Sequence, residues 1–222
     1  MFKTETHLHT AEVSVCGKIA AEELVRRYRD AGYHTVFVTD HFQDNTLNSY
    51  GDIPWKEKVK LFFKGYELAK EAGEKCGVVV LPSAEVRLHT VPNHYLVYGI
   101  DAAFFEKRED ILDLSIEDFS AYAKENGVCI VQAHPFRDGA NSPTPNFVDA
   151  IEVYNLNCRH ENNTEKAYSL AVENRLPMTA GSDTHREEDI AASGIMTETP
   201  IESAEDYIRL LRANAVTPIV AE

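Results

Sequence analysis

The sequence of 222 residues contains no uninterrupted apolar stretch that approaches the roughly 20 residues needed to cross a bilayer. Its first ten residues, MFKTETHLHT, also lack the apolar region of a secretory signal. Hydrophobic residues make up 44% and charged residues 26% of the chain, which is ordinary for a globular protein and argues against disorder. We therefore expect a cytoplasmic protein without a membrane partner.

Basic residues are scarce relative to acidic ones, and the net charge at neutral pH is −14. A surface of this charge repels a phosphate backbone, so we do not expect a long nucleic acid as a partner. A small anionic substrate stays compatible with this charge, because a bound metal ion can reverse the sign of the local field.

Cysteine pairs and glycine-rich loops are also missing. The four cysteines contain no C-x-x-C pair and their spacing indicates no disulfide framework, so we expect reduced thiols. Cys16 is of interest because it follows closely on two histidines near the N-terminus. No glycine-rich phosphate-binding fingerprint follows the first predicted strand, which disfavours a dinucleotide-binding fold.

What the chain does contain is an alternation of short apolar strands and helical patterns. We predict strands over residues 3–10, 35–41, 77–86, 94–100, 128–135, 150–155 and 177–181. Helices are predicted over residues 19–32, 54–75, 115–127 and 161–174, and from residue 203 onward. This alternation implies parallel strands joined by crossover helices, in a barrel or an open sheet. In a barrel, the chemistry gathers at the carboxyl ends of the strands.

Residues that can bind a metal ion stand at the ends of these predicted strands. His7 and His9 are two positions apart, so both point to the same face of the first strand. His94 is preferred over His89 because it directly begins an apolar run. We expect eight side chains to gather: His7, His9, His41, Glu85, His94, His134, Asp183 and His185. Because zinc typically takes four ligands and a carboxylate can bridge two ions, this number indicates two or three divalent ions of Zn, Mn or Fe.

The order of these motifs along the chain resembles the PHP (polymerase and histidinol phosphatase) family. The motifs are H-x-H near the N-terminus, T-D-H, a separate Glu, a lone His, A-H-P and G-S-D-T-H, and they cover nearly the whole chain. The resemblance implies an α/β fold, a distorted seven-stranded (β/α)7 barrel, formed by residues 1–222 as one domain. It also implies a metal-dependent phosphoesterase.

The resemblance further implies which residues bind each ion. His7, His9, Glu85 and Asp183 would bind the first, and Glu85 would bridge to a second that His94 and His134 hold. His41 and His185 would hold a third. The loop that usually supplies one more ligand to the third ion reads AEVSVCG here and has no Asp or His at the expected place. We expect Glu12 to take this place, with Cys16 as the second choice.

Two further residues are assigned roles beside the ligands. Arg137 follows the A-H-P motif closely, and it either contacts a substrate phosphate through its planar guanidinium or forms a surface salt bridge. Asp183, His185 and Arg137 are the candidates for catalytic roles. Asp40 is expected to orient a neighbouring ligand rather than to bind metal itself.

The function expected from this resemblance is hydrolysis of a small phosphomonoester or nucleotide by a metal-activated hydroxide. The first alternative is a metal-dependent C–N hydrolase of the amidohydrolase type, which normally needs a bridging lysine at a strand end; no lysine stands at these strand ends. The second is a non-catalytic, metal-stabilised binding module, which the nearly complete ligand set disfavours. Nothing in the sequence indicates an oligomeric state.

Overall fold

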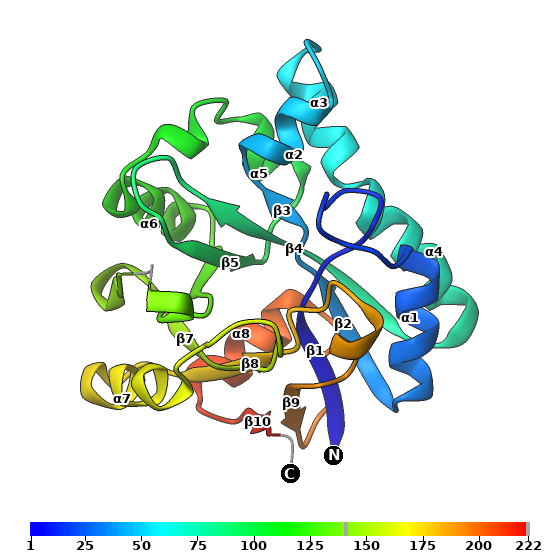
Figure 1. The fold of residues 1–222 in the computed structure, drawn as a ribbon, viewed down its shortest axis with the longest axis vertical. Helices are drawn as coiled ribbons and strands as arrows, with labels where there is room; N and C mark the ends of the chain where they lie inside the picture. Colours follow the sequence, from blue (N-terminus) through cyan, green and yellow to red (C-terminus); the bar gives the residue numbers. More distant parts are fainter. Residues whose placement is uncertain (140–141, 221–222) are drawn as a thin grey trace.

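Ten strands form one continuous sheet in the computed structural model, which describes residues 1–139 and 142–220 (Figure 1). They are β1 (Phe2–Leu8), β2 (Tyr33–Val38), β3 (His41–Phe42), β4 (Val79–Arg87), β5 (His94–Tyr98), β6 (Cys129–Gln132), β7 (Ala150–Asn155), β8 (Met178–Gly181), β9 (Gly194–Thr197) and β10 (Thr217–Ile219). The spatial order is β10-β9-β1-β2-β4-β5-β6-β7-β8, and β3 pairs with β4.

The sheet nearly closes on itself, because β8 approaches β1. Leu8 and Thr184 form a parallel bridge, and the Thr6 hydroxyl donates a 2.7 Å hydrogen bond to the Ala180 carbonyl. The predicted barrel-like α/β architecture is therefore present. The predicted count of seven strands is wrong, because β3, β9 and β10 also pair; each has only two to four residues, too few to show a periodic pattern.

The strands are not all parallel. β1, β2 and β4 pair in parallel, and so do β6, β7 and β8, but β5 is antiparallel to both of its neighbours. The expectation of parallel strands fails here because the connection from Arg87 to His94 is too short for a crossover helix. Since β5 runs in the opposite direction, its first residue, His94, lies at the edge where the parallel strands end and pairs with Arg87.

Eight α-helices in the described part of the chain surround this sheet (Figure 1). They are α1 (Ala21–Asp30), α2 (Asp44–Ser49), α3 (Trp55–Phe62), α4 (Lys64–Cys76), α5 (Ala102–Glu106), α6 (Ile116–Glu125), α7 (Thr164–Asn174) and α8 (Ala204–Arg212). The single helix predicted over residues 54–75 is divided into α3 and α4. Phe62 and Phe63 are both buried, and adjacent residues on one straight helix point about 100° apart, so the break lets both rings enter the core.

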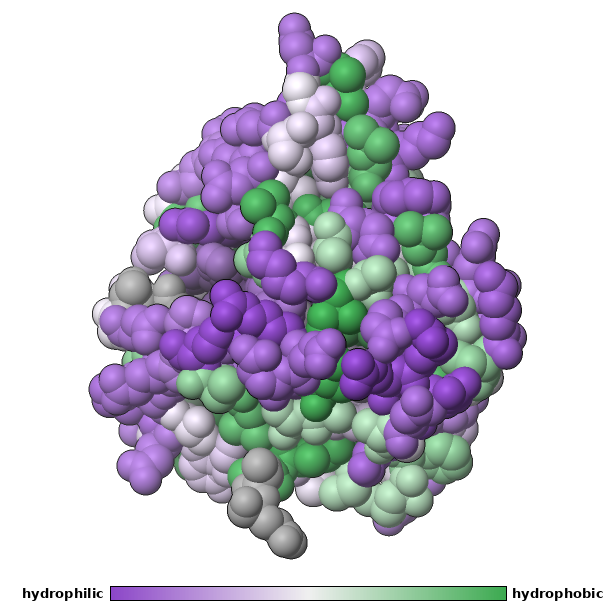
Figure 2. Space-filling view, turned by 45° about the vertical axis from the view of Figure 1, so that its right-hand side comes forward, coloured by the Kyte–Doolittle hydropathy of each residue, from purple (hydrophilic) through white to green (hydrophobic). Residues whose placement is uncertain are grey.

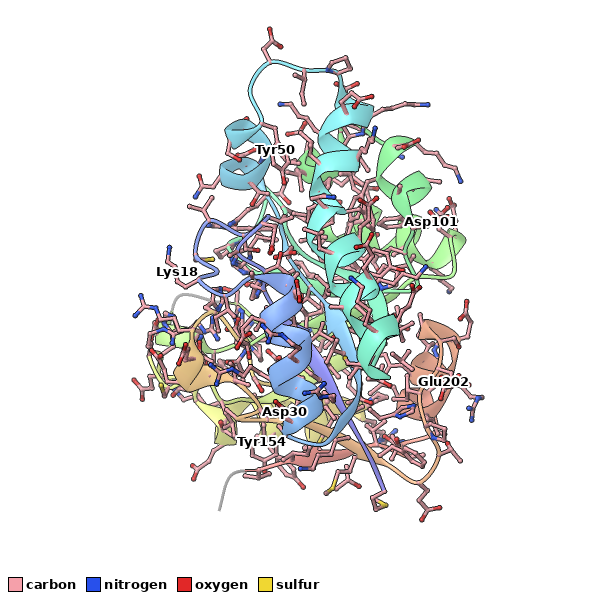
Figure 3. All side chains as sticks on the ribbon, turned by 90° about the vertical axis from the view of Figure 1, so that its right-hand side faces the viewer. Lys18, Asp30, Tyr50, Asp101, Tyr154 and Glu202 are labelled. Carbon is pink, nitrogen blue, oxygen red and sulfur yellow. The ribbon has the colours of Figure 1, made fainter. Side chains whose placement is uncertain are left out.

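The helices are attached to the sheet through buried apolar faces. Leu24, Val25 and Tyr28 form the buried face of α1, which lies beside α4 (Figure 3). On the other side of β2, the rings of Phe37, Tyr98 and Tyr207 pack against one another and connect β2 and β5 to α8. These contacts hold the sheet curved, so that its strand ends converge.

The outer surface is mainly polar on the face that Figure 2 shows, where the most strongly hydrophilic residues form a band across the middle. None of the helices in the described part of the chain is long and apolar enough to cross a bilayer.

Gly181, the last residue of β8, lies too close to β1 for a side chain. A Cβ atom there would lie 2.5 Å from the Cβ of His7 and 3.0 Å from Glu152 Oε1. We expect Gly181→Ala to lower the free energy of unfolding by about 1–3 kcal/mol, because the added methyl overpacks the core. It should also weaken metal binding, since His7 must shift. Urea unfolding and metal titration measure the two effects.

Gly32→Ala is the control. Gly32 has a φ of +79° and nothing within 4 Å of an added Cβ, so this change costs only backbone strain and should leave metal affinity unchanged. Equal stability and metal affinity of Gly181→Ala and the wild type would contradict the close approach of β8 to β1.

Candidate metal centre

The eight side chains that we expected to gather lie together at one edge of the sheet. They come from six of its strands and the segments following them: His7 and His9 at β1, His41 at β3, Glu85 in β4, His94 at β5, His134 after β6, and Asp183 and His185 after β8. Each of the six histidines has a ring nitrogen within 4 Å of a carboxylate oxygen of Glu85 or Asp183.

Four buried ligand atoms converge at the centre of this cluster. His7 Nε2 lies 3.6 Å from Glu85 Oε2 and 3.4 Å from Asp183 Oδ1. His9 Nε2 lies 3.4 Å and 3.2 Å from the same two oxygens. All four atoms are buried, and within the described residues none of them makes a hydrogen bond of acceptable geometry, although Glu85 Oε2 also lies 2.7 Å from His41 Nδ1.

This arrangement fits a bound metal ion. A buried polar group without a partner costs about 1–3 kcal/mol, so four of them at one point require an explanation. A tetrahedral zinc ion with bonds of about 2.0–2.1 Å would place its nitrogen and oxygen ligands about 3.3–3.4 Å apart. The separations of 3.2–3.6 Å across the cluster are close to this spacing. The four residues are those that the resemblance implies for the first ion.

The Glu85 carboxylate occupies the middle of the larger set. Its Oε1 lies 2.8 Å from His94 Nδ1 and 3.0 Å from His134 Nε2, and its Oε2 lies 2.7 Å from His41 Nδ1. Burial would raise the pKa of Glu85, but the adjacent His94, His41 and His7 hold it well below its usual range. Because its two oxygens face different histidines, an ionised Glu85 is placed to bridge two ions.

A third group of ligands lies toward the outside. The rings of His41 and His185 each stack on His9 at a centroid distance of 4.2 Å. Burial, with His41 and His185 nearby, lowers the pKa of His9 well below its usual value, so this imidazole is neutral and able to bind metal. Cys16 interacts with His185 and His41; burial alone would raise the pKa of its thiol, but these contacts lower it to about 6.

Glu12 does not join this group, and its expected role is corrected. Its carboxylate accepts hydrogen bonds of 3.0 and 3.2 Å from the Ala21 N–H at the start of α1, where a negative charge is favourable. The side chain is exposed and belongs to none of the metal-binding groups found in the described residues. The loop after His9 turns tightly, with Ser14 N–H bonded to the Thr10 carbonyl, so that a later residue than Glu12 faces the histidines.

Glu152 contacts two of the ligand residues, His7 and His134, on the side away from the converging ligand atoms. This residue was not identified from the sequence. Its Oε1 lies 2.8 Å from His7 Nδ1, and its Oε2 accepts 3.0 Å hydrogen bonds from His134 N–H and Asn155 Nδ2. A carboxylate at Nδ1 fixes the tautomer that presents Nε2 to the metal. The signal in the sequence was the acidic residue inside the apolar run AIEVYN, which is fully buried in β7.

Asp40 orients ligands through Ser14. Its carboxylate accepts hydrogen bonds of 2.7 Å from the Thr10 N–H, the Thr10 hydroxyl and the Ser14 hydroxyl. Ser14 Oγ lies 3.3 Å from His9 Nδ1 and accepts a 3.0 Å bond from His41 N–H. This agrees with the expectation that Asp40 positions a ligand rather than binding metal.

Arg137 lies at the edge of the centre and not in a surface ion pair. Its Nη2 donates to Asp183 Oδ2 and to Asn155 Oδ1, the latter at 2.8 Å, and its Nε donates to Asn162 Oδ1 at 2.9 Å. The side chain is 16% exposed. Within the described residues, Nη1 makes no hydrogen bond, so this nitrogen is left for a ligand.

Two of the ligand residues have unusual backbone conformations. His134 has a φ of +28° and Asp183 a φ of +51°, a region that residues other than glycine adopt rarely. Both stand directly after short strands, where the turn directs their side chains back over the strand ends. Strain of this kind is concentrated at functional sites.

The centre opens into a pocket of about 350 Å³. Its lining consists of Cys16, His41, His94, His134, Arg137, Asp138, His160 and His185. Asp138 and His160 were not expected there; they lie 2.8 Å apart at the side chains. A small molecule can therefore reach the outer histidines, while His7, His9 and Asp183 stay fully buried.

Comparisons with known proteins address the fold. A family model described as PHP-associated matches residues 161–216, a segment that contains Asp183 and His185. No curated protein matches the sequence. Among solved structures, a two-domain protein from Bacteroides vulgatus containing a predicted PHP-like metal-dependent phosphoesterase superposes with a TM-score of 0.71, at 15% identity over 99% of this chain and 64% of its own.

Two other solved structures are similar. An amidohydrolase from Chromobacterium violaceum has a TM-score of 0.59, at 17% identity over 97% of both chains. A lesion-specific endonuclease from Pyrococcus furiosus has a TM-score of 0.66, at 14% identity over 96% of this chain and 56% of its own.

The chain has a PHP-type fold. The resemblance predicted from the order of the motifs is thereby confirmed. In this PHP-type fold, the nearly closed sheet brings the histidines and carboxylates of distant motifs to one edge, in groups whose donor atoms lie within 4.8 Å of one another.

Replacement of Glu152 tests whether this carboxylate positions His7 for metal binding. We expect Glu152→Gln to weaken metal affinity roughly 10–100-fold, because an amide can no longer serve all three donors that the carboxylate accepts from. Metal titration by calorimetry measures the change, and Glu173→Gln, an exposed substitution on α7, is the matched control. Unchanged affinity in Glu152→Gln would show that His7 is oriented without it.

Proposed function

We propose that this protein is a metal-dependent phosphoesterase that hydrolyses a small phosphomonoester or nucleotide. The observation that carries the proposal is the convergence of four buried atoms at the spacing of metal ligands, none with a hydrogen bond of acceptable geometry within the described residues: His7 Nε2, His9 Nε2, Glu85 Oε2 and Asp183 Oδ1. A donor set of imidazole and carboxylate suits zinc, manganese or iron.

Divalent ions held by these residues would supply a water of pKa near 7 and would polarise a phosphoryl oxygen. The chain's own groups prepare the site for this chemistry. Glu85 and Asp183 are kept ionised, each with a pKa well below its usual range in spite of burial, because histidines and, for Asp183, Arg137 lie beside them. Both carboxylates are thus ready to bind cations at neutral pH.

Arg137 is the residue that we assign to the substrate phosphate. Its Nε and Nη2 are fixed by Asn162, Asn155 and Asp183, so that the guanidinium is held in one orientation. Its Nη1 is left to donate to an anionic oxygen in the pocket. Donors fixed before the reaction stabilise developing charge without reorganisation.

The pocket favours a small substrate. Its volume of about 350 Å³ is near the lower end of the range of ligand pockets, about 300–1,000 Å³. The net charge of −14 also disfavours a long nucleic acid, although the similar Pyrococcus furiosus protein is an endonuclease. A phosphomonoester with a compact organic group fits both constraints.

Hydrolysis of a C–N bond is the second candidate, favoured by the structural similarity to an amidohydrolase. Amidohydrolase-type centres normally use a bridging lysine. Among the described residues, the pocket lining contains none, and Glu85, whose two oxygens face different histidines, would hold the bridging position. The phosphoester reading therefore has the stronger support.

Metal dependence is tested on one preparation. We expect two or more ions per chain by elemental analysis, and hydrolysis of 4-nitrophenyl phosphate that disappears on chelation and returns with Mn²⁺ or Zn²⁺. His9→Ala should lose this activity and bind less metal, because it removes a central ligand. His34→Ala is the control, since His34 pairs with Glu202 on the surface.

Bound metal without hydrolysis of monoesters or diesters would instead favour C–N hydrolysis or a binding module, and a panel of amide substrates separates these two. Absence of bound metal under all conditions would overturn the proposal.

Arg137→Lys tests the assignment of the phosphate contact. We expect kcat/KM for 4-nitrophenyl phosphate to fall roughly 100-fold, because lysine keeps the charge but not the fixed planar donors. Arg212→Lys, a change in an exposed ion pair of α8, should have no effect. Equal kcat/KM values for Arg137→Lys and the wild type would remove Arg137 from the site.

A further inference from the structure

The pocket over the metal centre contains a histidine–carboxylate pair beside the ligands. Asp138 Oδ2 lies 2.8 Å from His160 Nδ1. Asp138 stands in the turn after β6, and His160 in the loop between β7 and α7. Neither residue belongs to the potential metal-binding groups of the described residues, although both line the pocket together with Arg137 and the outer ligand histidines. The pair is therefore placed to act on a molecule that occupies this pocket.

The two segments that carry the pair are also bonded to each other through the backbone. Asp138 N–H donates to the Glu161 carbonyl at 2.9 Å, and Asp138 Oδ1 accepts a 3.2 Å bond from Glu161 N–H. Asp138 has a φ of +49°, which residues other than glycine adopt rarely, and strain of this kind is concentrated at functional sites. The carboxylate is thus fixed beside the imidazole of His160.

The residues on either side of His160 anchor its loop to the rest of the site. Arg159 Nη1 and Nη2 donate at 2.6 and 2.8 Å to the two oxygens of Asp189, a fully buried residue, and such a paired contact fixes both position and orientation. Asp189 Oδ2 also accepts a 2.9 Å bond from the N–H of the ligand His185. On the other side, Asn162 Oδ1 accepts from the guanidinium that we assign to the substrate phosphate. The loop is therefore held on both sides of His160.

Hydrolysis of a phosphate ester needs a proton donor whenever the departing oxygen is a strong base. In the loaded site, the ligand histidines of the pocket would be engaged by metal ions. Arg137 does not release a proton in proteins. Among the remaining side chains of the lining, His160 is the histidine, the side chain that ordinarily exchanges a proton between about pH 5 and 8 and that most often serves as a general acid.

We propose that His160 is the general acid of this site, which protonates the oxygen that leaves phosphorus, and that Asp138 is the residue that positions its ring. The inference rests on the phosphoesterase activity of the proposed function. Nδ1 of His160 donates to Asp138, and within the described residues Nε2 makes no hydrogen bond, so this nitrogen is left for the substrate.

The proton balance of this step is closed. The bond between phosphorus and the leaving oxygen breaks, its electron pair stays on that oxygen, and the proton of His160 Nε2 converts it to a hydroxyl. The water whose oxygen replaces the leaving group on phosphorus gives one proton to solvent, and His160 is protonated again from solvent. The products are an alcohol and inorganic phosphate.

The test compares two substrates of similar size that differ in their leaving group. 4-Nitrophenyl phosphate releases a weakly basic phenolate, whereas benzyl phosphate releases a strongly basic alkoxide. We expect His160→Gln to lower kcat roughly 100-fold for benzyl phosphate, since general acids contribute about 10²–10⁴-fold, and only a few-fold for 4-nitrophenyl phosphate. Glutamine can still donate a hydrogen bond, so this difference reports transfer of the proton. Asp138→Asn should change the ratio of the two kcat values in the same direction and by less.

His34→Gln is the matched control, because His34 Nε2 pairs with Glu202 Oε1 at 2.9 Å outside the pocket lining; both kcat values should equal those of the wild type. His160 is 38% exposed, so His160→Gln should fold and bind as much metal as the wild type, which urea unfolding and elemental analysis check.

An equal ratio of the two kcat values in the wild type and His160→Gln would overturn the inference, whether both values fall together, as a purely structural role requires, or neither falls. In that case, hydrolysis of 4-nitrophenyl phosphate by the wild type and its loss in His9→Ala would still support the proposed function. A metal-loaded wild type that hydrolyses neither substrate would overturn both proposals.

Discussion

The buried carboxylate of Glu85 is the interaction on which the arrangement of the site depends. A negative charge that is 1% exposed requires positive or donor groups around it, and here they are histidines from four other strands or strand ends. His7, His41, His94 and His134 all approach its two oxygens. Each of these contacts fixes the end of a different strand relative to β4, so the site and the curvature of the sheet stabilise each other.

The reversed direction of β5 has a similar importance. In an all-parallel sheet, a histidine at the start of a strand would lie at the opposite edge from the other ligands. The tight β4–β5 connection turns the chain back, so His94 faces Glu85 from the adjacent strand at 2.8 Å. Closure of β8 onto β1 then brings Asp183 to His7 and His9, which lie more than 170 positions earlier in the chain.

The sequence was sufficient to predict those ligands that lie two positions apart in one strand or stand at the end of a predicted strand. The alternation of strand side chains predicted that His7 and His9 act together, and the apolar run after His94 distinguished it from His89, which pairs with Asp44 and Asp113 outside the centre.

The sequence was not sufficient where the conformation of a loop decides which side chain faces the metal centre. Glu12 and Cys16 are both polar residues of one loop, and only the turn at Thr10 and Ser14 determines which of them faces His41. Glu152 was missed because its partner, the back of the His7 ring, is 145 positions away.

The acidic character of the chain is compatible with an anionic substrate only if the centre is loaded with metal first. Without ions, the pocket leads to Glu85 and Asp183, and the net charge of −14 opposes the approach of a phosphate. Each divalent ion would bring two positive charges, more than either carboxylate neutralises, so bound metal would invert the local field while the outer surface stays negative. Arg137 alone is already partly neutralised by Asp183 and cannot produce this inversion. For the proposed phosphoesterase, the order of binding that follows is metal before substrate, and the negative surface would restrict entry to anions small enough to reach the ions directly.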